Sequence, residues 1–261
     1  MSVREPRAVQ TFGTIIVVGG GCYGSYYVRQ LQRAVKANAI QAERVVVVDR
    51  DANCRVVGER AASTDAPSLR VEVVVREWRS FFDEYLSGAA LDEESTTRDA
   101  IVPSPLMPHL MGEWLVARAR ARFDDRVSTR PFDVIPDVPW ERAGADGTHY
   151  VSFATWMCPI NCVEPRICPH TRDERSWSMP ERVAEFAQTI PNTESALLFC
   201  RHRAYGVGMF DTSEVLAADR RIVAAGERGH AEVVIGTVSH CHGALTRLVI
   251  GVGGSTHSTV G

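Results

Sequence analysis

The sequence predicts an α/β protein, in which a doubly wound parallel sheet is followed by a smaller C-terminal α/β region that carries a cysteine-rich loop. Three observations support this fold class. Apolar strand segments alternate with helical segments over the first half of the chain, which is the pattern of a parallel sheet covered by helices. A glycine cluster joins the first strand to the first helix. Three cysteines and three prolines share one short segment of the second half.

The first half contains four expected strands. Thr14–Val18 is continuously apolar, and the helix that follows extends to about Ala37 with apolar residues at helical spacing. Four consecutive valines in Arg44–Asp49 are typical of a strand that is buried on both faces. The third and fourth strands are expected at Val71–Val75 and Ala100–Val102, and an amphipathic segment, Trp78–Leu86, lies between them. A helix at His109–Phe123 and an additional edge strand at Val127–Phe132 follow.

The second half begins after a stretch rich in proline, aspartate and glycine, Pro136–Gly147, which we interpret as a linker or surface loop. It separates two expected domains, at residues 12–135 and 148–252. C-terminal strands are expected at Tyr150–Thr155, Ser195–Cys200, Ala231–Val238 and Ala244–Val252. Helices are expected at Pro180–Thr189 and Thr212–Val223.

Composition excludes several classes of function. The chain has 261 residues, of which 45% are hydrophobic and 23% charged, as in an ordinary globular protein. A formal net charge of -3 argues against binding to nucleic acid or to an anionic membrane surface. No apolar run approaches the ~18 residues of a membrane span, and Met1–Gln10 has no apolar stretch of the kind found in secretion signals. We therefore expect a cytoplasmic protein.

The glycine cluster contains the spacing G-x-G-x-x-G, at Gly19, Gly21 and Gly24. Its context matches a dinucleotide site, because an apolar strand precedes it and a helix follows. In such a turn the first glycine permits the sharp bend, the second lets the backbone approach a pyrophosphate, and the third lets helix and strand pack closely. Amides at the start of the helix would then face the anion.

Other residues around this turn complete the predicted nucleotide site. Asp49 ends the second strand, where its carboxylate would accept hydrogen bonds from the adenosine ribose and repel the extra phosphate of NADP. Arg50 follows directly and would weaken that preference for NAD. Cys22 and Tyr23 lie inside the turn and are included among the binding residues, although packing is the alternative role for Cys22.

The stretch from Ile15 to Asp51, with Ile-Val-Val-Gly-Gly-Gly-Cys-Tyr-Gly at one end and Val-Val-Val-Val-Asp-Arg-Asp at the other, resembles the NAD(P)-binding Rossmann superfamily. Its Asp-Arg-Asp ending is similar to that of the nucleotide-binding domains that regulate potassium uptake. The resemblance covers the N-terminal half and implies a fold and a cofactor class only. FAD and S-adenosylmethionine are the alternative ligands, and the three-glycine spacing favours a dinucleotide.

A proline-rich loop, Pro103–Pro108, directly follows the expected strand at Ala100–Val102. Ligands of doubly wound sheets bind outside the carboxyl ends of the strands, so this loop should border the nucleotide. His109 would then start the next helix, where the helix dipole favours its neutral imidazole. We expect His109 to be a catalytic acid–base or orienting group, with an exposed helix-cap residue as the alternative.

Three cysteines, Cys158, Cys162 and Cys168, are spaced C-x3-C-x5-C in an irregular segment. Cysteine before proline also occurs in ferredoxin cluster motifs, which favours an iron–sulfur cluster of the 4Fe-4S type. Zinc is the direct rival, and reactive thiols without metal remain a third interpretation. Cys241, in a turn between two expected strands, is the favoured fourth ligand, and Cys200 and His170 are the alternatives.

Together these sites predict an NAD(H)-binding protein with a cysteine-ligated metal centre, acting as a redox enzyme of the NAD-dependent oxidoreductase type. Coupling a hydride carrier to a cluster usually requires a flavin, and the sequence shows no flavin motif. Two other interpretations therefore stay open, a regulatory redox or nucleotide sensor without turnover and a zinc-containing Rossmann enzyme whose metal acts as a Lewis acid. The expected partner is a small-molecule substrate or a redox protein, and a homo-oligomer is also open.

Overall fold

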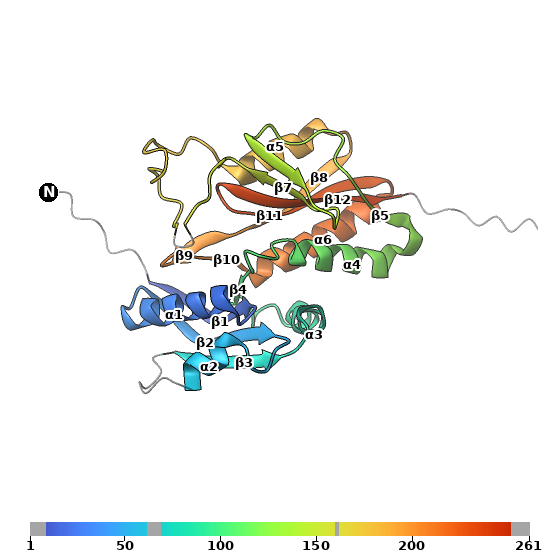
Figure 1. Cartoon of the computed structure of the whole chain (residues 1–261). Coiled ribbons are helices and arrows are strands. Elements are labelled where there is room, and N and C mark those ends of the chain that lie inside the picture. The colour runs from blue at the N-terminus through green and yellow to red at the C-terminus, as the bar shows by residue number, and fades with distance from the viewer. Residues whose placement is uncertain (1–8, 62–68, 160–161, 252–261) are drawn as a thin grey trace, which may run out of the picture. The chain divides into compact units, whose positions relative to one another are not determined.

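A computed structural model describes residues 9–61, 69–159 and 162–251 (Figure 1). The chain forms two compact units. Unit 1 comprises the described residues of Met1–Met107, Cys158–Arg175 and Cys200–Leu216, and unit 2 comprises those of Pro108–Met157, Ser176–Phe199 and Ala217–Gly261. Each unit is built around a mixed sheet, so the molecule is an α/β protein.

Unit 1 contains a six-stranded sheet of order β3-β2-β1-β4-β10-β9. Its first four strands are parallel, whereas β10 is antiparallel to β4 and β9 is antiparallel to β10. Its elements are β1 (Gln10–Val18), α1 (Cys22–Lys36), β2 (Ile40–Asp49), α2 (Arg55–Ala61), β3 (Arg70–Val75), α3 (Trp78–Leu91), β4 (Ala100–Val102), β9 (Arg201–Ala204), β10 (Val207–Asp211) and the start of α6 (Thr212–Glu227).

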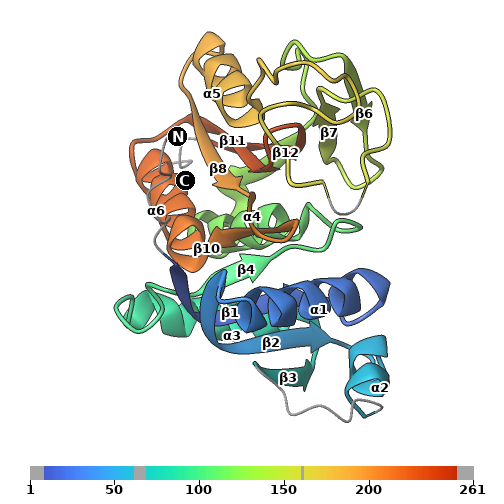
Figure 2. The ribbon, with the colours of Figure 1, turned by 90° about the vertical axis from the view of Figure 1, so that its left-hand side faces the viewer.

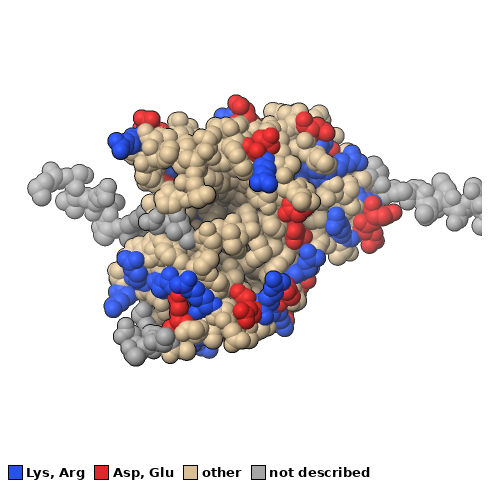
Figure 3. Space-filling view, viewed as in Figure 1, with Lys and Arg blue, Asp and Glu red and all other residues tan. Residues whose placement is uncertain are grey.

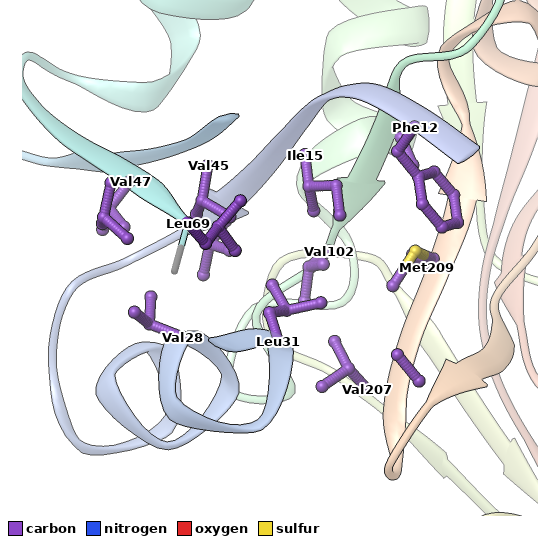
Figure 4. Packing of buried hydrophobic residues seen from close by; sticks show 14 of the residues in the cluster. Phe12, Ile15, Val28, Leu31, Val45, Val47, Leu69, Val102, Val207 and Met209 are labelled. Carbon is purple, nitrogen blue, oxygen red and sulfur yellow. The ribbon is translucent and has the colours of Figure 1, made fainter. Parts of the chain in front are cut away.

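The core of unit 1 follows from the alternation of side chains along buried strands. Ile15 of β1 and Val45 of β2 are paired in register and point to the face that α1 covers with Val28 and Leu31 (Figure 4). Ile16, the next residue of β1, is equally buried and points to the opposite face of the sheet. Because both faces are covered, continuous apolar strands are what this sheet requires.

Unit 2 contains a five-stranded sheet of order β6-β7-β12-β11-β8, and β5 also pairs with β12. Only the β11–β8 pair is parallel. Helix α5 covers one face, and α4 with the second part of α6 covers the other (Figures 1 and 2). The elements are α4 (Leu110–Phe123), a 3-10 turn (Asp124–Arg126), β5 (Val127–Arg130), β6 (Trp140–Ala143), β7 (His149–Ser152), α5 (Met179–Thr189), β8 (Thr193–Phe199), β11 (Ala231–Val238) and β12 (His242–Ile250).

The longer elements agree with the sequence pattern, and four short ones do not appear in it: α2, β6, β9 and β10. The stretch Pro136–Gly147, interpreted from sequence as a linker, contains β6, whose four residues are all exposed. Strand β9 alternates arginine with histidine and alanine. Such short or charged segments are strands because a neighbouring strand pairs with them, and local periodicity does not reveal that pairing.

A buried carboxylate ties unit 1 together. Asp99 Oδ1 accepts a hydrogen bond from the Thr14 amide of β1 at 2.6 Å, and Oδ2 accepts one from the Tyr85 hydroxyl of α3 at 2.8 Å. The Tyr85 oxygen also lies 3.0 Å from Thr212 Oγ1. Burial raises the pKa of Tyr85 above its usual value, so its hydroxyl stays protonated and can donate to Asp99.

Charged side chains of both signs are interspersed on the face drawn in Figure 3, as expected for a nearly neutral chain. Among the described residues, no helix has both the length and the apolar character needed to cross a membrane.

We predict that Asp99→Ala lowers the free energy of unfolding by about 2–3 kcal/mol, because it leaves the buried Thr14 amide without its carboxylate acceptor and removes the hydrogen bond from the Tyr85 hydroxyl. The matched control is Glu84→Ala on α3, whose side chain is 74% exposed and which should change stability by less than about 0.5 kcal/mol. Denaturant unfolding of both variants measures the difference. Equal stability of the two variants would show that Asp99 does not join these elements.

Candidate functional site

The three glycines of the turn between β1 and α1 differ in backbone conformation and in the space around them. Gly19 has a φ of +85°, in the region that favours glycine. A Cβ on Gly21 would meet no atom within 4 Å, so the backbone there is open to an approaching group. A Cβ on Gly24 would overlap the carbonyl oxygen of Gly19. Backbone conformation therefore favours glycine at position 19 and close packing requires it at position 24, whereas Gly21 leaves its backbone uncovered.

The amide that follows the first glycine is directed at the acid that ends β2. Gly20 N–H donates to Asp49 Oδ2 at 2.6 Å, and the Asp51 amide donates to Asp49 Oδ1 at 2.9 Å. A carboxylate has about four acceptor positions, so each oxygen of Asp49 keeps one for another donor. Asp49 is half-buried, and these two bonds hold it beside the glycine turn.

The N-terminus of α1 carries no acidic residue in its first turn. Its positive end is therefore not balanced by a side chain of its own helix. Cys22, the first helical residue, is exposed, and Tyr23 is half-buried. Arg50 is directed to solvent, with 82% of its side chain exposed and its Nη1 atom 3.9 Å from Glu77 Oε1.

The segment that leads into α2, around Cys54 and Val56, packs against the glycine turn. The Val56 amide donates to the carbonyl of Gly20 at 3.1 Å, and a Cβ on Gly20 would overlap the side chain of the buried Cys54. The sequence pattern assigns no role to Cys54. The structure shows that its small side chain packs against the glycine turn.

The cysteine segment belongs to unit 1 and contains a short hairpin. The Cys168 amide donates to the carbonyl of Asp173 at 2.9 Å, and the Arg172 amide donates to the carbonyl of Cys168 at 2.8 Å. The Glu164 amide approaches Cys162 Sγ at 3.4 Å. Cys158 and Cys162 are half-buried, as is Cys168.

Cys241 lies in unit 2, in the turn between β11 and β12. Its sulfur accepts a hydrogen bond from the indole nitrogen of Trp177 at 3.3 Å. All seven cysteines are among the described residues, and none forms a disulfide. Among the described residues, one group of three side chains has its ligand atoms close enough together to hold a metal ion, and this group contains no cysteine. The three thiols of unit 1, Cys158, Cys162 and Cys168, do not form such a group, and the cysteine-ligated centre stays a prediction.

Two thiols of unit 1 differ in acidity. Hydrogen bonds from the backbone of Thr171 and His170 lower the pKa of Cys168 below its usual value. Burial, together with the nearby Glu164, raises the pKa of Cys200 to about 12. The Cys200 sulfur packs against Gly208, where a Cβ would lie only 2.7 Å from it. Cys200 is therefore a packing residue.

His109 lies in unit 2, immediately before α4, where the sequence places it. Its Nδ1 atom is 3.2 Å from the Tyr150 hydroxyl and 3.6 Å from Asp146 Oδ2, and its Nε2 atom is 3.6 Å from Glu113 Oε1. Sequence reasoning missed these three neighbours. The spacing of four between His109 and Glu113 is a signal that could have identified one of them.

The fold is thus that of an α/β protein with two mixed sheets, of which the first is largely parallel. The family model AF_1314_C, described as "Uncharacterized protein, C-terminal domain", matches residues 111–251, which is more than half of the chain. The chain belongs to this family. Comparisons with curated proteins and with solved structures found no match.

We predict that Gly24→Ala costs about 1–3 kcal/mol of stability, because its Cβ must displace the Gly19 carbonyl. Gly21→Ala is the matched control, since its Cβ enters open space, and it should cost less than about 1 kcal/mol as a change at a helix N-cap. Thermal unfolding of the two variants checks the prediction. A Gly24→Ala protein as stable as Gly21→Ala would contradict the close packing described above.

The two thiol pKa shifts predict different alkylation. A lowered pKa means more thiolate at a given pH, so iodoacetamide should modify Cys168 with a midpoint below the usual ~8.5. Cys200 should stay unmodified at that pH. Peptide mass spectrometry across a pH series measures both, with the urea-unfolded chain as the control in which the two thiols react alike. The same pH midpoint for Cys168 in the folded and unfolded chain would contradict the prediction.

Proposed function

We propose that this protein binds NAD(H) through the glycine turn of unit 1, in a Rossmann-type arrangement, and serves a redox reaction. The observation that carries the proposal is the turn itself. Gly21 leaves its backbone open, while Gly24 allows α1 to begin directly against the Gly19 carbonyl. A glycine turn used only for packing would need the close contact at Gly24. It would not need the uncovered backbone at Gly21.

The sheet order supports the same ligand position. Strands β3-β2-β1-β4 are parallel and in the order of a mononucleotide-binding half. The glycine turn follows the carboxyl end of β1, and the loop that begins at Pro103 follows the carboxyl end of the adjacent β4. In doubly wound sheets dinucleotides bind outside the carboxyl ends of the strands, at the point where the strand order reverses. Here that point lies between β1 and β4. Beyond β4 the sheet departs from that fold, because β10 and β9 are antiparallel additions.

Asp49 supports NAD as the preferred dinucleotide. Its carboxylate keeps free acceptor positions for ribose hydroxyls, and its negative charge would oppose the 2′-phosphate of NADP. Arg50, which follows Asp49 and is exposed, would weaken this preference for NAD, because its positive charge would attract the 2′-phosphate of NADP. The pyrophosphate would lie against Gly21 and the first turn of α1, where the helix end is not occupied by an acidic side chain of its own.

A redox role follows from the ligand, since a nicotinamide exchanges hydride. A regulatory sensor that binds the nucleotide without consuming it would use the same turn. We place the protein in the cytoplasm. The sequence pattern at Cys158, Cys162 and Cys168, with Cys241 as the fourth ligand, supports a cysteine-ligated centre.

The test replaces Gly21 with valine. A branched side chain in the open space should block the pyrophosphate and lower NAD affinity by at least about 100-fold, a change of ~2.7 kcal/mol, while the fold is kept. The matched control is Gly58→Val on α2, which also enters open space but lies outside the turn. Asp49→Asn should weaken NAD binding by about 1–2 kcal/mol and narrow its advantage over NADP. Calorimetry on the nucleotide-free protein measures all four proteins.

Equal NAD affinity in the wild-type protein, Gly21→Val and Asp49→Asn would refute the nucleotide site. If the wild-type protein binds NADH and also oxidises it with an artificial electron acceptor, the protein is an enzyme. Binding without oxidation would identify the sensor.

A further inference from the structure

A second cluster of ligating side chains lies in unit 2, outside the proposed nucleotide turn. His109, Glu113 and Asp146 each offer one atom such that the three atoms lie within 4.8 Å of one another. Among the residues that the structure describes, these three form the group with metal-binding geometry. They come from two separate elements, so their convergence is a product of the tertiary fold.

Helix α4 positions the first two residues. His109 precedes the helix and Glu113 follows four residues later, which places both side chains on one face. Leu110 and Trp114, on the buried side, anchor this end of the helix with 5% and 1% of their surfaces exposed. The face that carries His109 and Glu113 is thereby fixed toward the β6–β7 hairpin.

The turn of that hairpin positions Asp146. Its Oδ1 atom accepts a hydrogen bond from the Thr148 amide at 3.0 Å, and the Gly144 amide closes the turn on the Thr148 carbonyl at 2.7 Å. One carboxylate oxygen is therefore held by the turn, and the other, Oδ2, lies 3.6 Å from His109. The side chain is 34% exposed, so a solvent ion can reach it.

Tyr150 of β7 adds a polar group to this cluster. Its hydroxyl lies 3.2 Å from His109 Nδ1. The two carboxylates lie on opposite sides of the same imidazole, with Glu113 Oε1 3.6 Å from Nε2 and Asp146 Oδ2 3.6 Å from Nδ1. Two carboxylates this close to one another form a site that a cation would neutralise.

We propose that His109, Glu113 and Asp146 bind a divalent transition-metal ion, such as Mn²⁺ or Zn²⁺. One imidazole nitrogen and two carboxylates are a donor set that such ions accept. Three protein ligands leave coordination positions for water or a substrate, as in catalytic metal sites and unlike closed structural ones. The side chains are 18%, 36% and 34% exposed, which gives these positions access to solvent. His109, the predicted acid–base residue, thus becomes a metal ligand.

Mn²⁺ is the first probe, because it prefers oxygen ligands such as the two carboxylates and competes poorly for the thiolates of the cysteine segment. Electron paramagnetic resonance of free Mn²⁺, titrated into the full-length, nucleotide-free protein, gives stoichiometry and affinity. We expect one site. His109→Gln, Glu113→Gln and Asp146→Asn should each weaken it roughly tenfold or more.

The matched control is Glu141→Gln. It makes the same carboxylate-to-amide change on the same hairpin, but Glu141 pairs with His149 at 2.5 Å and not with His109. Circular dichroism and thermal unfolding confirm that each variant is folded. Zn²⁺ calorimetry on the same variants repeats the comparison with a second ion.

Weaker binding in the three variants and unchanged binding in Glu141→Gln would support the site. Two results would overturn it. Either the wild-type protein binds neither ion, in which case His109 makes only polar contacts with its two acidic neighbours, or binding occurs but is the same in all four variants. The nucleotide assay of Gly21→Val is separate, so either conclusion can fail without the other.

Discussion

The close approach of Gly24 to the carbonyl of Gly19 is the contact on which unit 1 depends. It brings the first turn of α1 against the end of β1, so that the helix runs back along the sheet and covers one face. The same approach directs the Gly20 amide to Asp49 and leaves Gly21 uncovered. A side chain at Gly24 would push the helix away, and both features would change together.

Strand β1 can occupy the middle of this sheet because it needs no polar face. Its neighbours β2 and β4 pair with it on both edges, and the carboxylate of Asp99, which directly precedes β4, accepts a hydrogen bond from the Thr14 amide. A buried carboxylate with two donors is a costly group to remove and an effective one for holding strands and helices in one arrangement.

The cysteine segment illustrates how spacing and geometry differ. C-x3-C-x5-C shows that three sulfurs are close along the chain. The backbone of the hairpin around Cys168 decides where each sulfur points, and Glu164 and Arg172 take positive φ values there. Sulfurs that are neighbours in sequence thus need not face one centre. The histidine and carboxylates of unit 2 do converge, although only the spacing of four between His109 and Glu113 is visible in the sequence.

The sequence by itself determined the long elements, the glycine turn and the position of His109 before a helix. These features are local, because apolar periodicity, glycine sterics and helix starts involve residues only a few positions apart. Tertiary structure decided the antiparallel additions of β10 and β9, the mostly antiparallel sheet of unit 2 and the meeting of His109 with Asp146 and Tyr150. Strand pairing and the register of the β6–β7 hairpin set those contacts, and both depend on interactions between residues far apart in the chain.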